Sequence, residues 1–458
     1  MSITAIGILV VIFGLLIASF YKPIFGVLGY LTIYVIHNPD IWWGGYVQQY
    51  LPRPSFVAVI ILLLSSLLHL SKLNWRITRR EIELYLFLAI IWLVSVFFGA
   101  GIEKGNWFYL EKMTKLFVFI FLFNRVVVSI KHYKYIIGGL VLCACFLVFQ
   151  AHTVSSLHFA GARLDTLGGI DFREANGLGA FLALTVTFLG VELLRVSWPK
   201  RIVYVLAIGL MMNTMIMTQS RAIFLGLLIA TPYVLLRAPD GYRMKTFICV
   251  LLGAVLFFML ADIKFITRMD TIRVGIDYKN EEASARTQFW KASIPMFLDH
   301  PLGVGIKNFE RLLPNYGRFS DMDAHNTYVL CYSEAGIFGI VLFLIIIVEA
   351  LLQIRRVRIV VKGTLYEREI GLHAFALGAA LIIYLGGYMI AHSILYMEML
   401  WILLTLPICL ENGASKLLVS KTKPKTGSVS HMAKTYETTK SSDPENDKFV
   451  FESALISI

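Results

Sequence analysis

The chain has 458 residues, of which 57% are hydrophobic and 16% are charged, and its formal net charge is +12. Soluble domains carry about 25% charged residues, so this composition excludes a soluble globule. The positive charge does not indicate a nucleic-acid partner, because the Lys and Arg residues are dispersed over short loops between apolar segments. All five cysteines fall within apolar runs without metal-site spacing, so they are interpreted as small core residues.

Thirteen apolar segments follow one another along the chain. They lie near residues 3–20, 24–37, 55–71, 83–98, 113–129, 135–151, 176–194, 202–219, 222–236, 246–262, 326–352, 370–391 and 394–411. About 20 apolar residues cross a bilayer as a helix, and because the first two segments are short, twelve or thirteen spans are expected. Continuous apolar runs such as 340–348 differ from the alternating strands of a membrane barrel. The sequence therefore predicts an all-α polytopic membrane protein.

The short loops alternate in charge, which predicts the orientation of the chain. Every second loop is rich in Lys and Arg, and the positive-inside bias places such loops in the cytoplasm. The longest of the remaining loops, 262–325, then faces the other side of the membrane. We expect a transmembrane region at 1–411 with 262–325 as its catalytic loop, followed by a flexible cytoplasmic tail at 412–458. The N-terminal segment lacks a basic n-region and a cleavage site, so it is expected to remain as a span.

Arg221 directly follows Ser220 at the junction of two apolar segments, on the predicted outer side. Ser220 is a natural N-cap, which would place Arg221 in the first turn of a helix. A helix N-terminus already attracts anions, and a guanidinium adds a fork that suits phosphate. The alternative interpretation is an arginine that only reaches the membrane interface.

The long polar loop contains a second arginine, Arg286, which begins a segment that includes Trp290 and ends at Asp299. The pattern predicts a short interfacial helix with aromatic anchors, in which Arg286 either binds a substrate or only meets lipid headgroups. Pro301-Leu-Gly-Val-Gly305 follows and predicts a turn.

His325 lies immediately before Asn326, a natural cap for the long helix expected at 326–352. The positive end of a helix favours a neutral imidazole, which is the form that a general base requires. Asp321 and Asp323 give this stretch a weak resemblance to a metal site, but a solvated loop is the favoured interpretation. No metal and no cofactor are expected.

Glu334 lies inside the same apolar segment, where an ionisable group is either functional or paired for structural reasons. A structural role, with one of the arginines as partner, is the favoured interpretation. Gly336 and Gly339 follow it and permit close packing of helices.

Together these motifs resemble the O-antigen ligase and polymerase superfamily over residues 176–345. The resemblance is carried by Ser220-Arg221, Ser284-Ala-Arg286 with Trp290, Pro301-Leu-Gly-Val-Gly305, His325-Asn326-Thr-Tyr328 and Glu334-Ala-Gly336-Ile-Phe-Gly339. Phe25-Gly-Val-Leu-Gly-Tyr30 and His37-Asn-Pro39 are similar to the O-glycosylation ligase branch that is associated with exosortase systems.

The resemblance implies an enzyme of the bacterial inner membrane that moves a glycan from an undecaprenyl-diphosphate carrier to an acceptor hydroxyl at the periplasmic face. The acceptor, a lipid, a protein or another saccharide, stays open. By motif, Arg221 and Arg286 would bind the diphosphate and His325 would activate the hydroxyl. Attack by that hydroxyl in line with the anomeric carbon predicts inversion of configuration.

Further candidate contacts to carrier or acceptor are Arg163, Asn176, Trp290, Asn326, Tyr328 and Glu334. A polymerase on the same scaffold is the first alternative, since it uses the same donor chemistry. A non-catalytic transporter of lipid-linked glycans is the second. It would favour broken helices in paired repeats, and the sequence shows no internal repeat.

Overall fold

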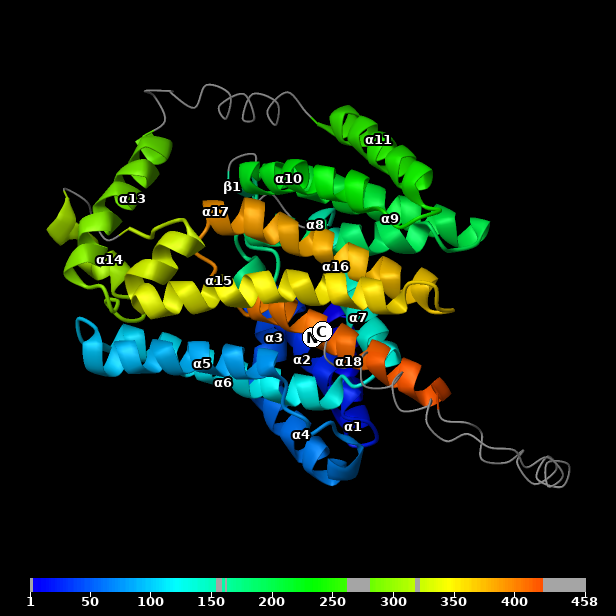
Figure 1. Ribbon diagram of the computed structural model, residues 1–458, viewed down its shortest axis with the longest axis horizontal. Coiled ribbons are helices and arrows are strands. Elements are labelled where there is room, and N and C mark those ends of the chain that lie inside the picture. The colour runs from blue at the N-terminus through cyan, green and yellow to red at the C-terminus, as the bar shows by residue number, and fades with distance from the viewer. Residues whose placement is uncertain (1–2, 154–158, 161–162, 262–280, 318–321, 423–458) are drawn as a thin grey trace, which may run out of the picture. The chain divides into compact units, whose positions relative to one another are not determined.

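The computed structural model describes residues 3–153, 159–160, 163–261, 281–317 and 322–422 (Figure 1). Two short strands, β1 (Phe159–Ala160) and β2 (Arg163–Leu164), form an antiparallel hairpin, and nearly all other regular structure in these ranges is helical. The first half of the chain forms α1 (Ile3–Ser19), α2 (Ile24–Ile36), α3 (Gly44–Tyr50), α4 (Pro54–Leu68), η1 (Leu70–Lys72), α5 (Arg79–Leu93), η2 (Val94–Phe98), α6 (Lys104–Val126), α7 (Ile130–Ala151), η4 (Ile170–Phe172) and α8 (Ala175–Leu193).

The second half forms α9 (Trp198–Met217), α10 (Arg221–Arg237), α11 (Arg243–Leu260), α13 (Glu281–Asp299), α14 (Phe309–Leu312), η5 (Leu313–Tyr316), α15 (Thr327–Val361), η6 (Glu367–Gly371), α16 (Leu372–Ile383), η7 (Tyr384–Tyr388), α17 (Met389–Ala391) and α18 (Glu398–Thr422). Each of the thirteen predicted apolar segments lies largely on these helices.

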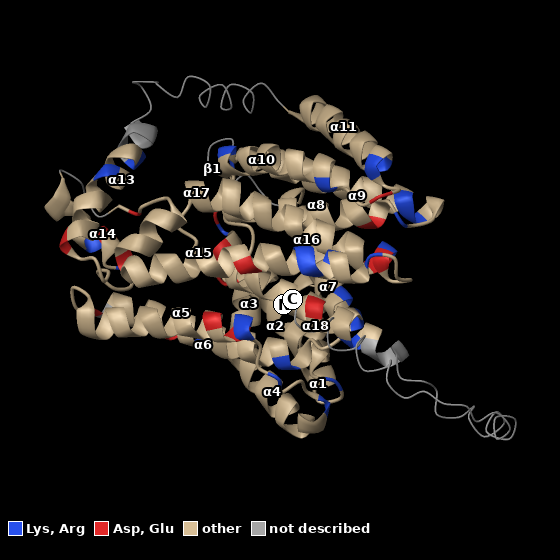
Figure 2. Ribbon diagram, in the orientation of Figure 1, with Lys and Arg blue, Asp and Glu red and all other residues tan. Residues whose placement is uncertain are grey.

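Seven helices of the described part are long and apolar enough to cross a membrane, or eight if the bent pair α3 and α4 is one span. The seven are Arg79–Phe98, Ile130–Ala151, Ala175–Leu193, Trp198–Met217, Arg243–Leu260, Thr327–Val361 and Glu367–Ala391. Figure 2 shows that the charged residues of α5 and α11 lie at one end of each helix. The all-α polytopic membrane class is confirmed, while the total of twelve or thirteen spans stays a prediction.

The helices are packed around α8, α16 and α18, whose side chains are mostly buried. On α11, in contrast, only Thr246 and Phe257 are buried, and side chains such as Leu252 and Phe258 are exposed. Exposed apolar side chains of this kind are suited to contact with lipid, because lipid tails are as apolar as the side chains themselves. Burial thus separates a central group of helices from a lipid-facing layer.

A buried ion pair fixes the turn before α5. Arg125 and Glu81 are paired, and each side chain is only 1% exposed. The Arg125 guanidinium also donates to the backbone oxygen atoms of Asn74 (2.8 Å) and Arg76 (2.9 Å). Glu81 closes a capping box with Thr78 at the start of α5. Charges inside a membrane protein are tolerated when they are paired in this way.

A second buried network centres on Asp171 in η4. Its carboxylate accepts hydrogen bonds from the Tyr34 hydroxyl (2.7 Å) and the Glu398 backbone N–H (2.8 Å), and it pairs with Lys112 (3.3 Å). The Tyr30 hydroxyl donates to Glu398. These bonds join α2, α6 and α18 to the segment that leads into α8.

The Pro301–Gly305 motif is inserted into a break in α15. Gly336 leaves the helical conformation there, with φ 67° and ψ −166°. The backbone N–H groups of Val304 and Gly305 donate to the oxygen atoms of Ser333 (2.9 Å) and Glu334 (3.0 Å). The Ile337 N–H donates to the Pro301 oxygen (3.0 Å). The motif forms the expected turn, and that turn supplies the bonds which the broken helix lacks.

The chain divides into two units, Met1–Ser415 and Lys416–Ile458. The helix α18 ends at Thr422, and the residues after it lie outside the described part. Residues 262–280 of the predicted catalytic loop lie outside it as well. The division into a region 1–411 and a tail 412–458 stays a proposal.

Candidate functional site

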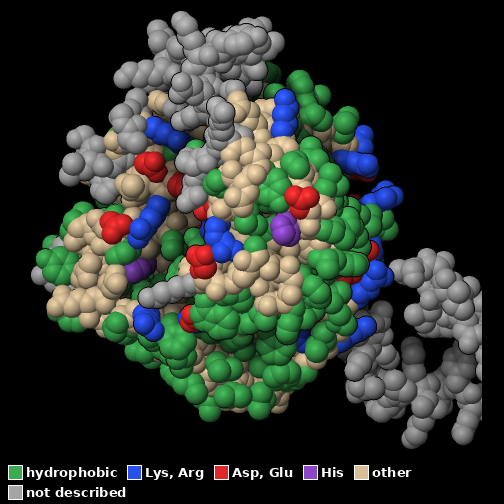
Figure 3. All heavy atoms as spheres, turned by 90° about the vertical axis from the view of Figure 1, so that its left-hand side faces the viewer, with side chains coloured by type: hydrophobic (Ala, Val, Ile, Leu, Met, Phe, Trp, Pro, Cys, Tyr) green, Lys and Arg blue, Asp and Glu red, His purple; other side chains and the backbone are tan. Residues whose placement is uncertain are grey.

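Polar residues from four parts of the chain meet at one end of the helices. They come from the β2–α8 connection, the α9–α10 junction, the segment from α13 to the start of α15, and the α17–α18 connection. Figure 3 views the side of the molecule where α13 and α14 lie and shows charged and histidine side chains gathered among hydrophobic ones.

Two histidines, His325 and His392, are neighbours in this region. The rings of His325 and His392 have centroids 6.0 Å apart and lie nearly perpendicular, and Tyr388 lies 5.4 Å from His392. Burial lowers the pKa of His392 to about 3, and further contributions come from the charges of Arg286, His325 and Arg163. His392 is therefore neutral at pH 7, and the structure brings two of the candidate arginines, Arg163 and Arg286, into the surroundings of His392.

His325 is held by the residues on either side of it. The Trp290 indole N–H donates to the Ala324 oxygen (2.9 Å), and Asn326 caps α15 by accepting from Tyr328 N–H (2.9 Å) and Val329 N–H. His325 itself has a φ of 48°, a backbone conformation that is uncommon outside glycine. Its Nδ1 atom is buried and has no hydrogen-bond partner in the part of the chain that the structure describes.

Thr327 connects the segments of the two histidines. Its hydroxyl donates to the His392 backbone oxygen (2.6 Å) and accepts from the Ile394 N–H (3.0 Å). The start of α15 and the α17–α18 connection are thus bonded to each other directly beside the imidazoles.

The β2–α8 connection is bonded to the α9–α10 junction. Arg163 donates to the Thr218 backbone oxygen (3.1 Å), and the Ser220 hydroxyl donates to Asn176 (2.7 Å). Ser220 also caps α10 by accepting from the Ile223 N–H, as predicted, so Arg221 stands in the first turn. Because Ser220 caps α10 at this end of the helices, Arg221 lies at the same end. Arg286 lies in the surroundings of His392.

Two carboxylates complete the group. Glu174 lies 3.9 Å from the Nδ1 atom of His392 and is largely exposed. Asp323 is close to Lys307 and His325, and burial raises its pKa. The group of Arg163, Glu174, Arg286, Asp323, His325 and His392 is called the imidazole cluster below.

Sequence reasoning missed three members of this environment, His392, Glu174 and Tyr388. The signal for His392 was present, because it lies between the apolar segments 370–391 and 394–411. The alternating topology placed that junction on the same side as His325. For Glu174 and Tyr388 no comparable signal exists, since both belong to longer stretches without a distinctive pattern.

Several predicted contact residues make bonds within the protein. Asn326 and Trp290 do so as described, and the Tyr328 hydroxyl donates to the Leu385 oxygen (3.1 Å). Both Glu334 carboxylate oxygens accept bonds, one from the Phe309 N–H (3.1 Å) and one from the Tyr396 hydroxyl. Glu334 is therefore positioned for the structural role that the sequence favoured, although with these partners rather than an arginine. Their contacts to carrier or acceptor stay predictions.

No group of three or more His, Cys, Asp or Glu side chains within the described ranges is arranged to hold a metal ion. Asp321, which the sequence placed in a weakly metal-like spacing, lies outside these ranges.

Comparison with known families supports the interpretation of the motifs. Residues 206–344 match the O-antigen ligase family model. The matched region contains Arg221, Arg286 and His325, whereas Arg163 and His392 lie outside it. None of the curated proteins matches the chain. The predicted resemblance to the O-antigen ligase superfamily is confirmed, and the chain is a multi-pass membrane protein whose residues 206–344 match the O-antigen ligase family model.

Proposed function

We propose that this protein transfers a glycan from an undecaprenyl-diphosphate carrier to an acceptor hydroxyl, with the imidazole cluster as the reaction site. The observation that carries the proposal is the convergence of Arg163, Arg286 and the His325 imidazole on His392. Cations suit the anionic carrier, and a neutral imidazole suits proton removal from an alcohol.

Arg221 and Arg286 are proposed to bind the diphosphate. A guanidinium presents a planar fork that matches phosphate oxygens, and the N-terminus of α10 adds its dipole beside Arg221. When the bond between the anomeric carbon and the phosphate oxygen breaks, its electron pair stays on the diphosphate. Two fixed guanidiniums stabilise that developing charge, so no strong general acid is required.

His325 is proposed to accept the proton of the acceptor hydroxyl while the hydroxyl oxygen bonds to the anomeric carbon. The oxygen attacks from the face opposite the leaving diphosphate, which inverts the configuration. A buried imidazole nitrogen without a partner among the described residues, as at Nδ1 of His325, is the kind of group that a substrate satisfies. A general base of this kind contributes about 10²–10⁴-fold to the rate. The proposed reaction uses no metal.

The proposed orientation places the imidazole cluster in the periplasm and the C-terminus in the cytoplasm of a bacterium with the protein in its inner membrane. Support comes from the basic residues at the other ends of the helices, among them Arg355 and Arg358 near the end of α15 and Lys362 directly after it.

The test is to resolve lipid-linked and finished glycans by length in cells that carry His325→Ala, the intact chain or a deletion. His69→Ala, a histidine outside the cluster, is the matched control. We favour a ligase, which predicts loss of finished conjugate and accumulation of full-length lipid-linked chains with His325→Ala. Accumulation of single repeat units would establish the polymerase instead. Normal glycans with normal expression of His325→Ala would refute the role of His325 as the base.

Arg221→Lys separates catalysis from transport. A lysine keeps the charge but cannot form the two-pronged contact, so a transferase should lose most of its activity. If transfer persists at the intact level, Arg221 serves only the topology of the chain and the transporter alternative gains support.

A further inference from the structure

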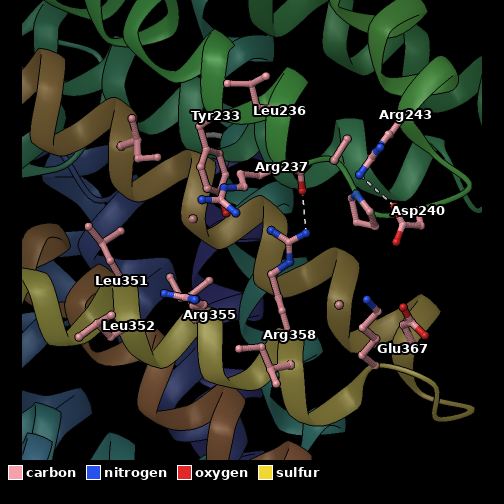
Figure 4. A pocket seen from close by; sticks show the side chains of 18 of the residues that line it. Tyr233, Leu236, Arg237, Asp240, Arg243, Leu351, Leu352, Arg355, Arg358 and Glu367 are labelled. Carbon is pink, nitrogen blue, oxygen red and sulfur yellow. Dashed lines mark hydrogen bonds and ion pairs between the residues drawn. The ribbon is translucent and has the colours of Figure 1, made fainter.

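A cavity of about 720 Å³ lies near the C-terminal end of α15, far from the imidazole cluster (Figure 4). Its lining residue Lys362 directly follows the end of α15, and the part of α15 after the break at Gly336 is about 37 Å long, at about 1.5 Å per residue. That distance exceeds the hydrocarbon core of a bilayer, about 30 Å. The cavity therefore belongs to the opposite membrane surface and is independent of the proposed reaction site.

The wall that α15 contributes changes character along the helix. Its lining residues return at helical spacing and lie mainly on one face: Val348, Leu351, Leu352, Ile354, Arg355, Arg358, Ile359 and Lys362. The first four are apolar, and three of the last four are cations. A cavity that is apolar toward the middle of the bilayer and cationic toward its surface matches the polarity of a membrane lipid.

Cations converge on the cavity from separate elements. Arg237 ends α10, Arg243 begins α11, and Arg355, Arg358 and Lys362 lie on α15 or directly after it, whereas Asp240 and Glu367 are the acidic lining residues. Figure 4 shows Arg237, Arg355 and Arg358 between the facing helices and Arg243 paired with Asp240 at a distance of 3.1 Å.

The cations of the cavity differ in their partners: Arg358 has partners within the protein, whereas Arg355 and Lys362 do not have them among the described residues. Arg358 donates to the Arg237 backbone oxygen (2.6 Å) and lies over the Phe375 ring (5.7 Å). Glu367 accepts from the Gly363 N–H (2.6 Å) rather than from a cation of the cavity. The side chains of Arg355 and Lys362 make no hydrogen bond or ion pair with the residues that the structure describes. The cavity thus keeps an excess of positive charge that an anion would neutralise.

We propose that this cavity binds an anionic phospholipid. Its phosphate would lie between Arg355, Lys362 and Arg237, and an acyl chain would follow the apolar part of the α15 wall. Basic pockets between membrane helices on the cytoplasmic side are suited to anionic headgroups. Leu236 is 76% exposed and Ile359 is 60% exposed, so the apolar wall opens toward the bilayer. A ligand that enters from there is a lipid rather than a free phosphate ion.

The experiment measures binding of phosphatidylglycerol to the purified full-length chain in neutral detergent, by native mass spectrometry and by the shift of the thermal unfolding midpoint. The charge variant is Arg355→Gln with Lys362→Gln. Each basic residue near an anionic lipid contributes about fivefold to affinity, so the double variant should bind about thirtyfold more weakly. The matched control is Lys72→Gln with Lys200→Gln, which removes the same charge from exposed positions outside the cavity.

A second variant, Leu352→Trp, fills the apolar wall and leaves every cation in place. It should also weaken binding, which keeps the proposal testable if the charge variant does not fold. Phosphatidylcholine and inorganic phosphate serve as further probes, and neither should raise the unfolding midpoint. The proposal is overturned if the control pair loses as much affinity as the charge variant, if phosphatidylcholine binds equally well, or if inorganic phosphate stabilises the chain as strongly as the lipid.

Discussion

Replacing Gly336 with alanine should strongly destabilise the protein. At φ 67° and ψ −166° this backbone is accessible almost only to glycine, and an L side chain there costs about 1–3 kcal/mol. A Cβ atom would also lie 2.3 Å from the Leu302 oxygen, so the inserted turn must move. Displacing it breaks the three backbone hydrogen bonds to α15, each contributing about 1 kcal/mol. The sum is about 4–6 kcal/mol, which is a large part of the stability of most proteins.

The assay is the free energy of unfolding in detergent micelles, with Gly190→Ala as the control. Gly190 lies on α8, and a Cβ atom added there would meet nothing within 4 Å, so alanine should be neutral or stabilising by about 0.5–1 kcal/mol. If Gly336→Ala unfolds with the same free energy as the intact chain, then the break in α15 does not depend on glycine and the reasoning is wrong.

Three further substitutions test the surroundings of the site. Asp171→Ala leaves Lys112 buried without its partner and should cost about 3–5 kcal/mol, measured by the same unfolding assay; Asp171→Asn should cost less. The folded-state pKa of His392, about 3, lies below the ordinary value of about 6.5. Between these pH values only the unfolded state binds the proton, so the free energy of unfolding is highest above pH 6.5 and decreases as the pH falls toward 3. His392→Gln should flatten the pH dependence of stability in that window by up to about 1.4 kcal/mol per pH unit, and an unchanged slope would contradict the assignment. Trp290→Phe removes the bond to the Ala324 oxygen and should lower the rate of glycan transfer while the unfolding midpoint stays nearly unchanged, because it loosens the residue before His325. If the unfolding midpoint falls and the folded fraction of the variant transfers glycan at the intact rate, Trp290 acts only on stability.

The caps of the site helices could be predicted because capping is local. Ser220 and Asn326 accept from backbone N–H groups two or three residues further along the chain, so the residue type and its place before an apolar run were sufficient. The apolar segments were found for a related reason, since a membrane span is defined by its own composition.

The contacts of Glu334 could not be predicted in the same way. Its partners Phe309 and Tyr396 lie 25 residues before and 62 residues after it in the sequence. No local pattern reports which loop fills a break in a helix, and the glycines of Pro301–Gly305 indicated a turn without indicating its partner. The position of His392 between two apolar segments was readable, but its partners were not, because they are arginines and a histidine from distant segments.

The two hydrogen bonds of Thr327 have a mechanical consequence. A single hydroxyl binds both the carbonyl of His392 and the amide of Ile394, so these two hydrogen bonds hold the His392 backbone against the first turn of α15. If either element tilts, the other is pulled along with it, so the backbone segments that carry the two imidazoles keep their spacing.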